Sequence, residues 1–135
     1  MLKQISHVAL AVGNLDRACE FYRDVLGMEI VERKVVPEQK AEVAFVDIGG
    51  TARLELIAPT SDDSPVAKSI AKKGPGLHHI CFAVDKIEDR LDYLADHGIK
   101  LVDTKPRTGA EGGKIAFLHP TSTLGALVEF CEGCD

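Results

Sequence analysis

The hydrophobic pattern of the chain repeats after 72 residues. His7–Val12, which reads HVALAV, aligns with His79–Val84, which reads HICFAV, and both are apolar stretches rich in strand-forming residues. Farther along, Val43–Val46 aligns with Ile115–Leu118 at the same offset. We therefore expect two similar halves, each of which begins with a strand.

A helix pattern follows the first strand of each half. Asn14 is the expected N-cap of a helix over Leu15–Leu26, and Asp85 is the expected N-cap of a second helix, with Glu88 three residues later. Apolar residues recur at helical spacing in both segments. They are Leu15, Ala18, Phe21, Tyr22 and Val25 in the first segment, and Ile87, Leu91 and Leu94 in the second.

Each half then continues with further strands. The helices are expected to end at Gly27 and Gly98, because glycine adopts the left-handed conformation that ends many helices. The other matched strand segments are Met28–Val31 with Ile99–Val102, and Leu54–Leu56 with Val128–Phe130, the last pair at an offset of 74. Each half thus reads β-α-β-β-β, which predicts an α+β fold with two tandem βαβββ modules in a curved eight-stranded mixed sheet.

One βαβββ half is too small to bury a useful core alone, so we expect a single domain over residues 1–135. The expected parts are half-modules 1–58 and 77–135 and a linker over 59–76. Within the linker, Ser64 and Pro65 fit the N-cap and first position of a short helix that Gly74 ends.

Composition and charge narrow the class of protein. The chain has 135 residues, of which 45% are hydrophobic and 27% are charged, and this balance is typical of globular proteins. A net charge of −5 offers no basic field for nucleic acid. No apolar run reaches the roughly 20 residues of a membrane helix, and Met1–Gln4 does not open a signal peptide. We therefore expect a cytoplasmic protein that binds neither nucleic acid nor membrane.

The four cysteines do not resemble a disulfide framework. Cys19 and Cys81 stand alone in apolar segments, and Cys131 and Cys134 form a C-x-x-C pair without a second pair or a redox context. Reduced thiols are the expected state of all four.

Two polar residue types recur at matched positions of the repeat. His7 matches His79 at strand starts, and Glu55 matches Glu129 between apolar neighbours near strand ends. Two imidazoles and two carboxylates suit Zn²⁺, Co²⁺, Ni²⁺, Mn²⁺ or Fe²⁺. Each residue taken alone would be interpreted as an ordinary surface or core residue, but their repetition favours a metal site in a central trough of the sheet.

The repeated pattern resembles the vicinal oxygen chelate superfamily, which includes glyoxalase I, extradiol dioxygenases and antibiotic-resistance proteins. Within it, the chain is most similar to the methylmalonyl-CoA epimerases. The segments that carry the resemblance are His7–Val12, Val36–Lys40, Leu54–Pro59, Ser64–Lys68, Gly76–Ile80, Phe117–Pro120 and Gly125–Glu129. The most specific of them are Pro37–Gln39, Ser64–Pro65, His78–His79 and Leu118–Pro120.

The resemblance implies site residues and a metal. The implied ligands are His7, Glu55, His79 and Glu129, with cobalt expected first and zinc, nickel or manganese as alternatives. Neighbouring side chains of a strand face opposite ways, so only one of His78 and His79 can face the trough, and the register of the repeat makes His79 the expected ligand. The implied acid/base pair is Glu38 and Glu129.

The activity implied is interconversion of (R)- and (S)-methylmalonyl-CoA by 1,1-proton transfer through a metal-stabilised enolate, a step of propionate metabolism. A homodimer is expected. The basic candidates for contacts with coenzyme A are Lys72, Lys73, Lys105, Arg107 and Lys114, with His119 as a further polar candidate. A glyoxalase I-type lactoylglutathione lyase and a non-catalytic resistance protein that binds a small molecule stay open as alternatives.

Overall fold

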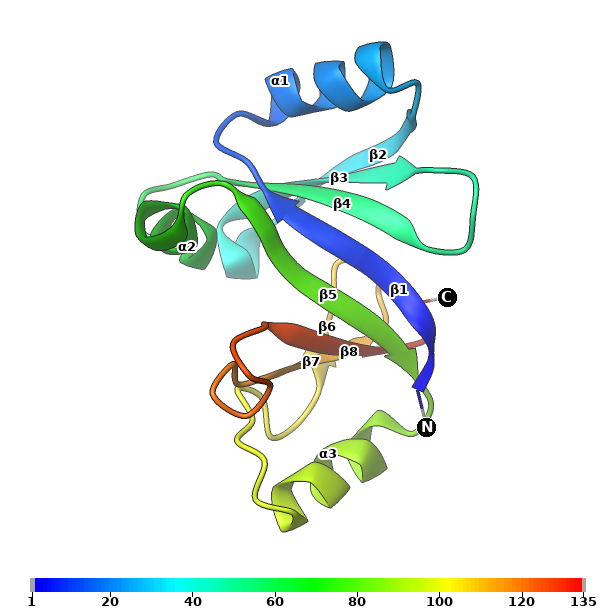
Figure 1. Ribbon diagram of the computed structural model, residues 1–135, viewed down its shortest axis with the longest axis vertical. Helices are drawn as coiled ribbons and strands as arrows, with labels where there is room; N and C mark the ends of the chain where they lie inside the picture. The colour runs from blue at the N-terminus through cyan, green and yellow to red at the C-terminus, as the bar shows by residue number, and fades with distance from the viewer. Residues whose placement is uncertain (1, 135) are drawn as a thin grey trace. The chain divides into compact units, whose positions relative to one another are not determined.

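The computed structural model describes residues 2–134. These residues contain three α-helices and eight strands, and the strands form one mixed sheet (Figure 1). The predicted α+β fold class is confirmed in this respect. The chain divides into two compact units. Unit 1 comprises the described residues 2–7 and 79–134, and unit 2 comprises Val8–His78, so that strands β1 and β5 each continue from one unit into the other.

Unit 2 contains four adjacent strands in the order β2-β3-β4-β1. Its elements are the end of β1 (Leu2–Ala11), α1 (Leu15–Glu20), the single-turn π-helix η1 (Phe21–Val25), β2 (Glu29–Val36), the 3-10 turn η2 (Pro37–Gln39), β3 (Ala41–Asp47), β4 (Arg53–Pro59), α2 (Pro65–Lys73) and the start of β5 (Gly76–Val84). Helix α1 lies over one face of this sheet (Figure 1), where Leu15 and Cys19 pack against Val46 and Leu56 in the core.

The helix predicted over Leu15–Leu26 forms, but its second half is wider than an α-helix. Asn14 is the N-cap, and its side chain accepts a hydrogen bond from the backbone N–H of Arg17 at 3.0 Å. The π-turn that follows adds a residue to the turn and rotates the later side chains away from the core. Phe21 and Val25, which were expected on the apolar face, are therefore exposed, at 48% and 67%.

The helix predicted in the linker is confirmed as α2. The hydroxyl of Ser64 accepts a hydrogen bond from the N–H of Val66 at 3.1 Å, Pro65 occupies the first turn, and Gly74 ends the helix with φ of 81°. No helix in the described part of the chain is long and apolar enough to span a membrane.

Unit 1 contains strands in the order β1-β5-β8-β7-β6. Its further elements are α3 (Ile87–Asp96), β6 (Arg107–Thr108), β7 (Lys114–Leu118) and β8 (Val128–Glu132). Strands β5 and β8 are parallel, whereas β8, β7 and β6 are antiparallel. Helix α3 packs Ile87 and Leu91 against Ala116 and Phe130. The expected apolar side of this helix is therefore confirmed for both residues.

The strand expected over Ile99–Val102 does not form, and only Leu101 makes an isolated bridge, to Leu118. The partner strand of β7 is instead the two-residue β6. The N–H of Phe117 donates to the Asp103 side chain at 2.8 Å, and Pro106 has no N–H to offer. These two residues interrupt pairing along β7, so the second half departs from the repeat at this point.

Asp85 is not the N-cap of α3, contrary to the expectation from its position. The N-cap is Lys86, in a left-handed conformation with φ of 51° and without a side-chain cap. The carboxylate of Glu132 on β8 accepts a hydrogen bond from the N–H of Ile87 at 2.7 Å instead. Asp85 pairs with Arg90 at 3.4 Å. The cap therefore comes from a residue 45 positions away.

The expectation that all four cysteines are reduced is wrong for one pair. The structure joins Cys131 and Cys134 by a disulfide at the end of β8, while Cys19 and Cys81 are buried and take no part in it. The two residues of a C-x-x-C segment lie near enough for this because the chain turns at Gly133, which has φ of 80°.

Candidate metal centre

His7, His79 and Glu129 lie on the neighbouring strands β1, β5 and β8 of unit 1. In β5, residues 79, 81 and 83 are buried while 78, 80 and 82 are only half-buried, which is the alternation of a strand with one face in the core. The three side chains are 6%, 9% and 4% exposed. His79 makes the contacts within this group, as the register of the repeat predicts.

The three side chains bring their polar atoms to one point. Nε2 of His7 and Nε2 of His79 are 3.1 Å apart, and each lies 3.1 Å from Oε1 of Glu129. Although it lies this close, Oε1 accepts no hydrogen bond of ordinary geometry from the described residues. Two imidazole nitrogens and one carboxylate oxygen, all buried, therefore form a nearly equilateral triangle.

The charge of Glu129 depends on its two histidine neighbours. Burial opposes ionisation of the carboxyl, but the close contacts with His7 and His79 outweigh it and lower its pKa from 4.5 to about 2. The carboxylate is consequently ionised at neutral pH, in an interior where an uncompensated charge would be costly.

The donor triangle fits a divalent metal ion. Two imidazole nitrogens and a carboxylate oxygen that lie 3.1 Å from one another are the ligand types that zinc and similar divalent ions would take. The Ser6 hydroxyl lies 3.3 Å from Nδ1 of His7, where it can accept the proton of an imidazole that binds metal through Nε2. The ring of Phe117 packs edge-on against His79, with centroids 5.3 Å apart, and helps to fix its orientation. The orphaned oxygen and the donor set together support a metal site.

The other two predicted site residues belong to unit 2. Glu55 is buried, at 7% exposure, on β4, where its Cα pairs with that of Phe45. Glu38 is exposed at the centre of the turn η2. The role of each in the site stays a prediction.

Cys81 is a nearby residue that sequence reasoning missed. It is fully buried, and its sulfur and the ligand atoms of His7 and Glu129 all lie within 4.8 Å of one another. Its Cα pairs with that of Glu129 across the parallel strands β5 and β8. The position two residues after His79 was a usable signal, because such residues share a face of a strand.

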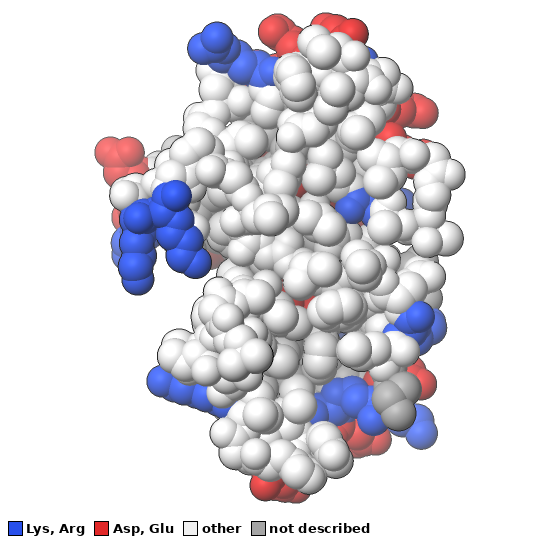
Figure 2. Space-filling view, in the orientation of Figure 1, with Lys and Arg blue, Asp and Glu red and all other residues white. Residues whose placement is uncertain are grey.

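The cationic candidates separate into paired and available groups. Lys114 forms an ion pair with Glu88 at 2.9 Å, and Arg107 lies 3.3 Å from Asp103. Lys72 and Lys73 lie exposed in the last turn of α2, where Figure 2 shows basic side chains gathered. The lysines of α2, together with the exposed Lys105, are therefore better placed to meet an anion than Lys114 and Arg107.

His119 stabilises a turn. Its Nδ1 accepts a hydrogen bond from the backbone N–H of Thr121 at 3.1 Å and lies 2.8 Å from the hydroxyl of the same residue. These contacts explain the presence of a histidine at this position, and no bound ligand is needed to explain it. The structure therefore gives His119 a structural role in the turn between β7 and β8.

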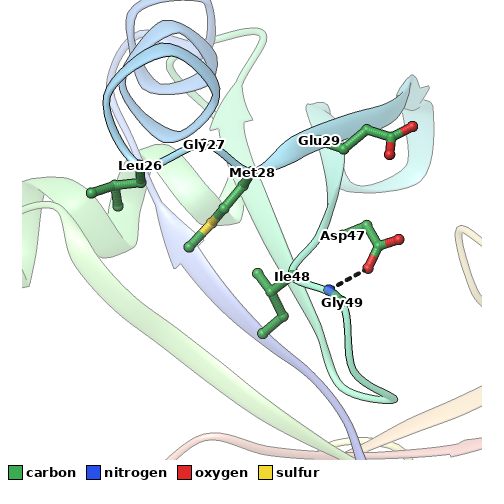
Figure 3. Close-up of a pocket in the computed structure, with 7 residues that line it drawn as sticks. All are labelled: Leu26, Gly27, Met28, Glu29, Asp47, Ile48 and Gly49. Atoms are coloured by element: carbon green, nitrogen blue, oxygen red, sulfur yellow. Dashed lines mark hydrogen bonds between the residues drawn. The ribbon is translucent and has the colours of Figure 1, made fainter.

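A pocket in unit 2 has no connection with the predicted chemistry. It is lined by Leu26, Gly27, Met28, Glu29, Asp47, Ile48 and Gly49 (Figure 3). Asp47 accepts a hydrogen bond from the N–H of Gly49 at 2.8 Å, which stabilises the loop after β3. None of the predicted site residues lines this pocket, so we do not regard it as the functional site.

Comparison with known proteins places this geometry in a family. The Glyoxalase/Bleomycin resistance protein/Dioxygenase superfamily matches residues 6–117. The chain belongs to this superfamily. The match includes His7, Glu55 and His79, and it confirms the family resemblance seen in the sequence.

Individual relatives are similar over nearly the whole chain. An uncharacterized protein of Bacillus subtilis, YqjC, is 44% identical over 97% of this chain and 93% of its own length. The mitochondrial methylmalonyl-CoA epimerase of Bos taurus is 40% identical over 95% of this chain and 73% of its own. The structure of Streptomyces coelicolor methylmalonyl-CoA epimerase in complex with 2-nitronate-propionyl-CoA superimposes with a TM-score of 0.92, at 36% identity, over 98% of this chain and 95% of that one. The chain is thus related to methylmalonyl-CoA epimerases.

Proposed function

We propose that this protein is a metal-dependent epimerase that interconverts (R)- and (S)-methylmalonyl-CoA. The observation that carries the proposal is the buried triangle of His7, His79 and Glu129, in a chain 40% identical to a methylmalonyl-CoA epimerase over 95% of its length. A site that binds metal through histidine and carboxylate and needs no redox cofactor suits an isomerase of this kind.

In this proposal His7, Glu55, His79 and Glu129 hold one divalent ion, with cobalt expected first and zinc, nickel or manganese as alternatives. When bound, the ion supplies positive charge that polarises the substrate's carbonyl oxygens and stabilises negative charge that develops on them. Two imidazoles and two carboxylates would hold the ion, and substrate oxygens would bind it beside these four side chains.

The proton transfers fall to Glu38 and Glu129. One carboxylate removes the proton from the α-carbon, and the carboxyl group of the other returns a proton to the opposite face, so the configuration inverts. Glu129 is ionised at neutral pH, which is the state that accepts a proton. Glu38 has no acidic counterpart in the second half of the repeat, since the offset of 72 places Ala110 there, and an asymmetric acid is what two different faces require.

The coenzyme A part of the substrate needs cations for its phosphates. Lys72 and Lys73 are the candidates that support this role, because both are exposed on one helical turn. We further propose that the protein works in the cytoplasm as a homodimer.

The proposal is tested by following deuterium from heavy water into each epimer of methylmalonyl-CoA. We expect the metal-loaded protein to exchange and invert the α-position, and a chelator to abolish both while the far-UV circular dichroism spectrum is retained. The Glu38→Gln variant should keep its metal and lose at least about 10²-fold in epimerisation, the usual scale for loss of a general acid or base. Residual exchange in this variant should be restricted to the epimer whose proton faces Glu129.

Two outcomes would contradict the proposal. Epimerisation by Glu38→Gln at a near wild-type rate would remove Glu38 from the mechanism. Absence of exchange with methylmalonyl-CoA, together with turnover of the hemithioacetal of methylglyoxal and glutathione, would instead favour the lactoylglutathione lyase alternative.

A further inference from the structure

Glu38 lies on a tight turn whose backbone is held by several hydrogen bonds. The turn η2 connects β2 to β3, and the N–H of Lys40 donates to the carbonyl oxygen of Pro37 at 3.1 Å. Lys40 closes the turn in the left-handed conformation, with φ of 48°. A non-glycine residue rarely adopts this conformation unless its surroundings hold it there.

The surroundings that hold the turn are residues 60–64, immediately before α2. Ser64 is completely buried, and its hydroxyl donates a hydrogen bond to the carbonyl oxygen of Gln39 at 2.9 Å. The same oxygen accepts from the N–H of Val66 at 3.1 Å, so one hydroxyl both caps α2 and attaches the turn to it. The N–H of Thr60 donates to the carbonyl oxygen of Lys40 at 2.8 Å.

A second, charged contact connects the same two segments. The ammonium group of Lys40 is paired with the carboxylate of Asp63, which also accepts a hydrogen bond from the Ser61 hydroxyl at 2.6 Å. The contact with Lys40, followed by that with Ser61, lowers the pKa of Asp63 to about 2. Gln39 and Lys40 are therefore both bonded to residues 60–64, immediately before α2, while the side chain of Glu38 is exposed to solvent.

We propose that Ser64 is a positioning residue that fixes the Glu38 turn for proton transfer, through its hydrogen bond to the carbonyl oxygen of Gln39. This inference rests on the proposed function. A carboxylate on a mobile loop samples many positions, and displacement of a catalytic group by about 1 Å can cost on the order of 10²-fold in rate. The hydroxyl of Ser64 reduces this freedom because it joins the turn to a helix of nine residues.

Two substitutions that are isosteric with each other separate the two roles of the hydroxyl. Asparagine and aspartate are both good N-caps, so Ser64→Asn and Ser64→Asp should each cap α2 through the N–H of Val66. Only the amide of asparagine can also donate to the carbonyl oxygen of Gln39, because an ionised carboxylate has no proton to donate. The pair is thus matched in size and capping and differs in the bond that the proposal requires.

The assay is deuterium exchange into each epimer of methylmalonyl-CoA, combined with epimerisation kinetics and urea denaturation. We expect kcat for epimerisation to be at least about tenfold lower in Ser64→Asp than in Ser64→Asn, with KM nearly unchanged. The exchange lost should be that of the epimer that Glu38→Gln also fails to exchange, while exchange of the other epimer stays close to wild type. General damage to the fold would lower both.

A third variant avoids the buried position. Asp63→Asn removes the charged contact with Lys40 at an exposed site, and we expect a smaller loss, about two- to fivefold, restricted to the same epimer. Equal activity of Ser64→Asp and Ser64→Asn, or equal loss of exchange from both epimers, would overturn the positioning role. Failure of the wild-type protein to exchange either epimer would instead contradict the proposed function itself.

Discussion

Glu132→Ala should destabilise the protein because it removes the cap of α3. The Glu132 carboxylate accepts a hydrogen bond from the N–H of Ile87 at 2.7 Å. The side chain of the N-cap residue, Lys86, makes no capping hydrogen bond. Loss of a cap costs about 1 kcal/mol, and loss of a negative charge at a helix N-terminus adds about 0.5 kcal/mol. We expect the free energy of unfolding to fall by about 1.5 kcal/mol, which corresponds to roughly 5 °C in Tm for a chain of this size.

Equilibrium unfolding in urea measures this loss, and amide hydrogen exchange locates it. Exchange should accelerate at the first amides of α3, from Ile87 onward. Glu132→Gln should recover part of the stability, since its amide oxygen still accepts while the charge is gone. Glu88→Ala is the matched control: it also removes a carboxylate near the N-terminus of α3, but one whose partner is the exposed Lys114, and such surface pairs contribute little. Unchanged stability and unchanged exchange at Ile87 in Glu132→Ala would refute the reasoning.

Two further predictions follow from the titratable groups. The pKa of Glu129 is lowered from 4.5 to about 2 in the folded state, so its ionised form stabilises the folded, metal-free protein at pH values above 4.5. This contribution to the free energy of unfolding should disappear as the pH falls from 4.5 to 2. Urea denaturation across this range should show a flatter profile for Glu129→Gln, and parallel profiles would count against the histidine contacts as the cause. Burial, which outweighs its charged neighbours, raises the pKa of Cys19, so iodoacetamide should label Cys19 at least about 10²-fold more slowly in the native than in the unfolded protein, as measured by peptide mass spectrometry. Comparable rates would contradict its burial.

Much of the fold was predictable because its signals are local. The caps at Asn14 and Ser64 depend on a side chain and a backbone N–H two or three residues away, and both form as expected. The match of His79 with His7 in the repeat likewise indicated which of two neighbouring histidines faces the core, and His79 is buried while His78 is only half-buried. Patterns that extend over a few residues specify such features before any long-range contact exists.

Other features escaped prediction because a distant residue decides them. Asp85 was an acceptable cap by sequence, but the carboxylate of Glu132 on β8 accepts the hydrogen bond at the start of α3 instead. The apolar segment Ile99–Val102 has the composition of a strand, yet Asp103 takes the N–H of Phe117 that a longer strand would need. The π-turn that exposes Phe21 and Val25 leaves no distinct pattern of apolar spacing.

The candidate site shows the same division. Duplicated histidine and glutamate in matched apolar strands are enough to suggest a metal site from the sequence alone, since repetition makes chance an inadequate explanation. Only the tertiary structure brings Nε2 of His7, Nε2 of His79 and Oε1 of Glu129 to 3.1 Å from one another and places Cys81 beside them. It also places Ser64 within hydrogen-bond distance of the turn that carries Glu38. The physical reason is that strand period and capping are fixed by neighbours in sequence, whereas the meeting of β1, β5 and β8 depends on the pairing of strands that are far apart along the chain.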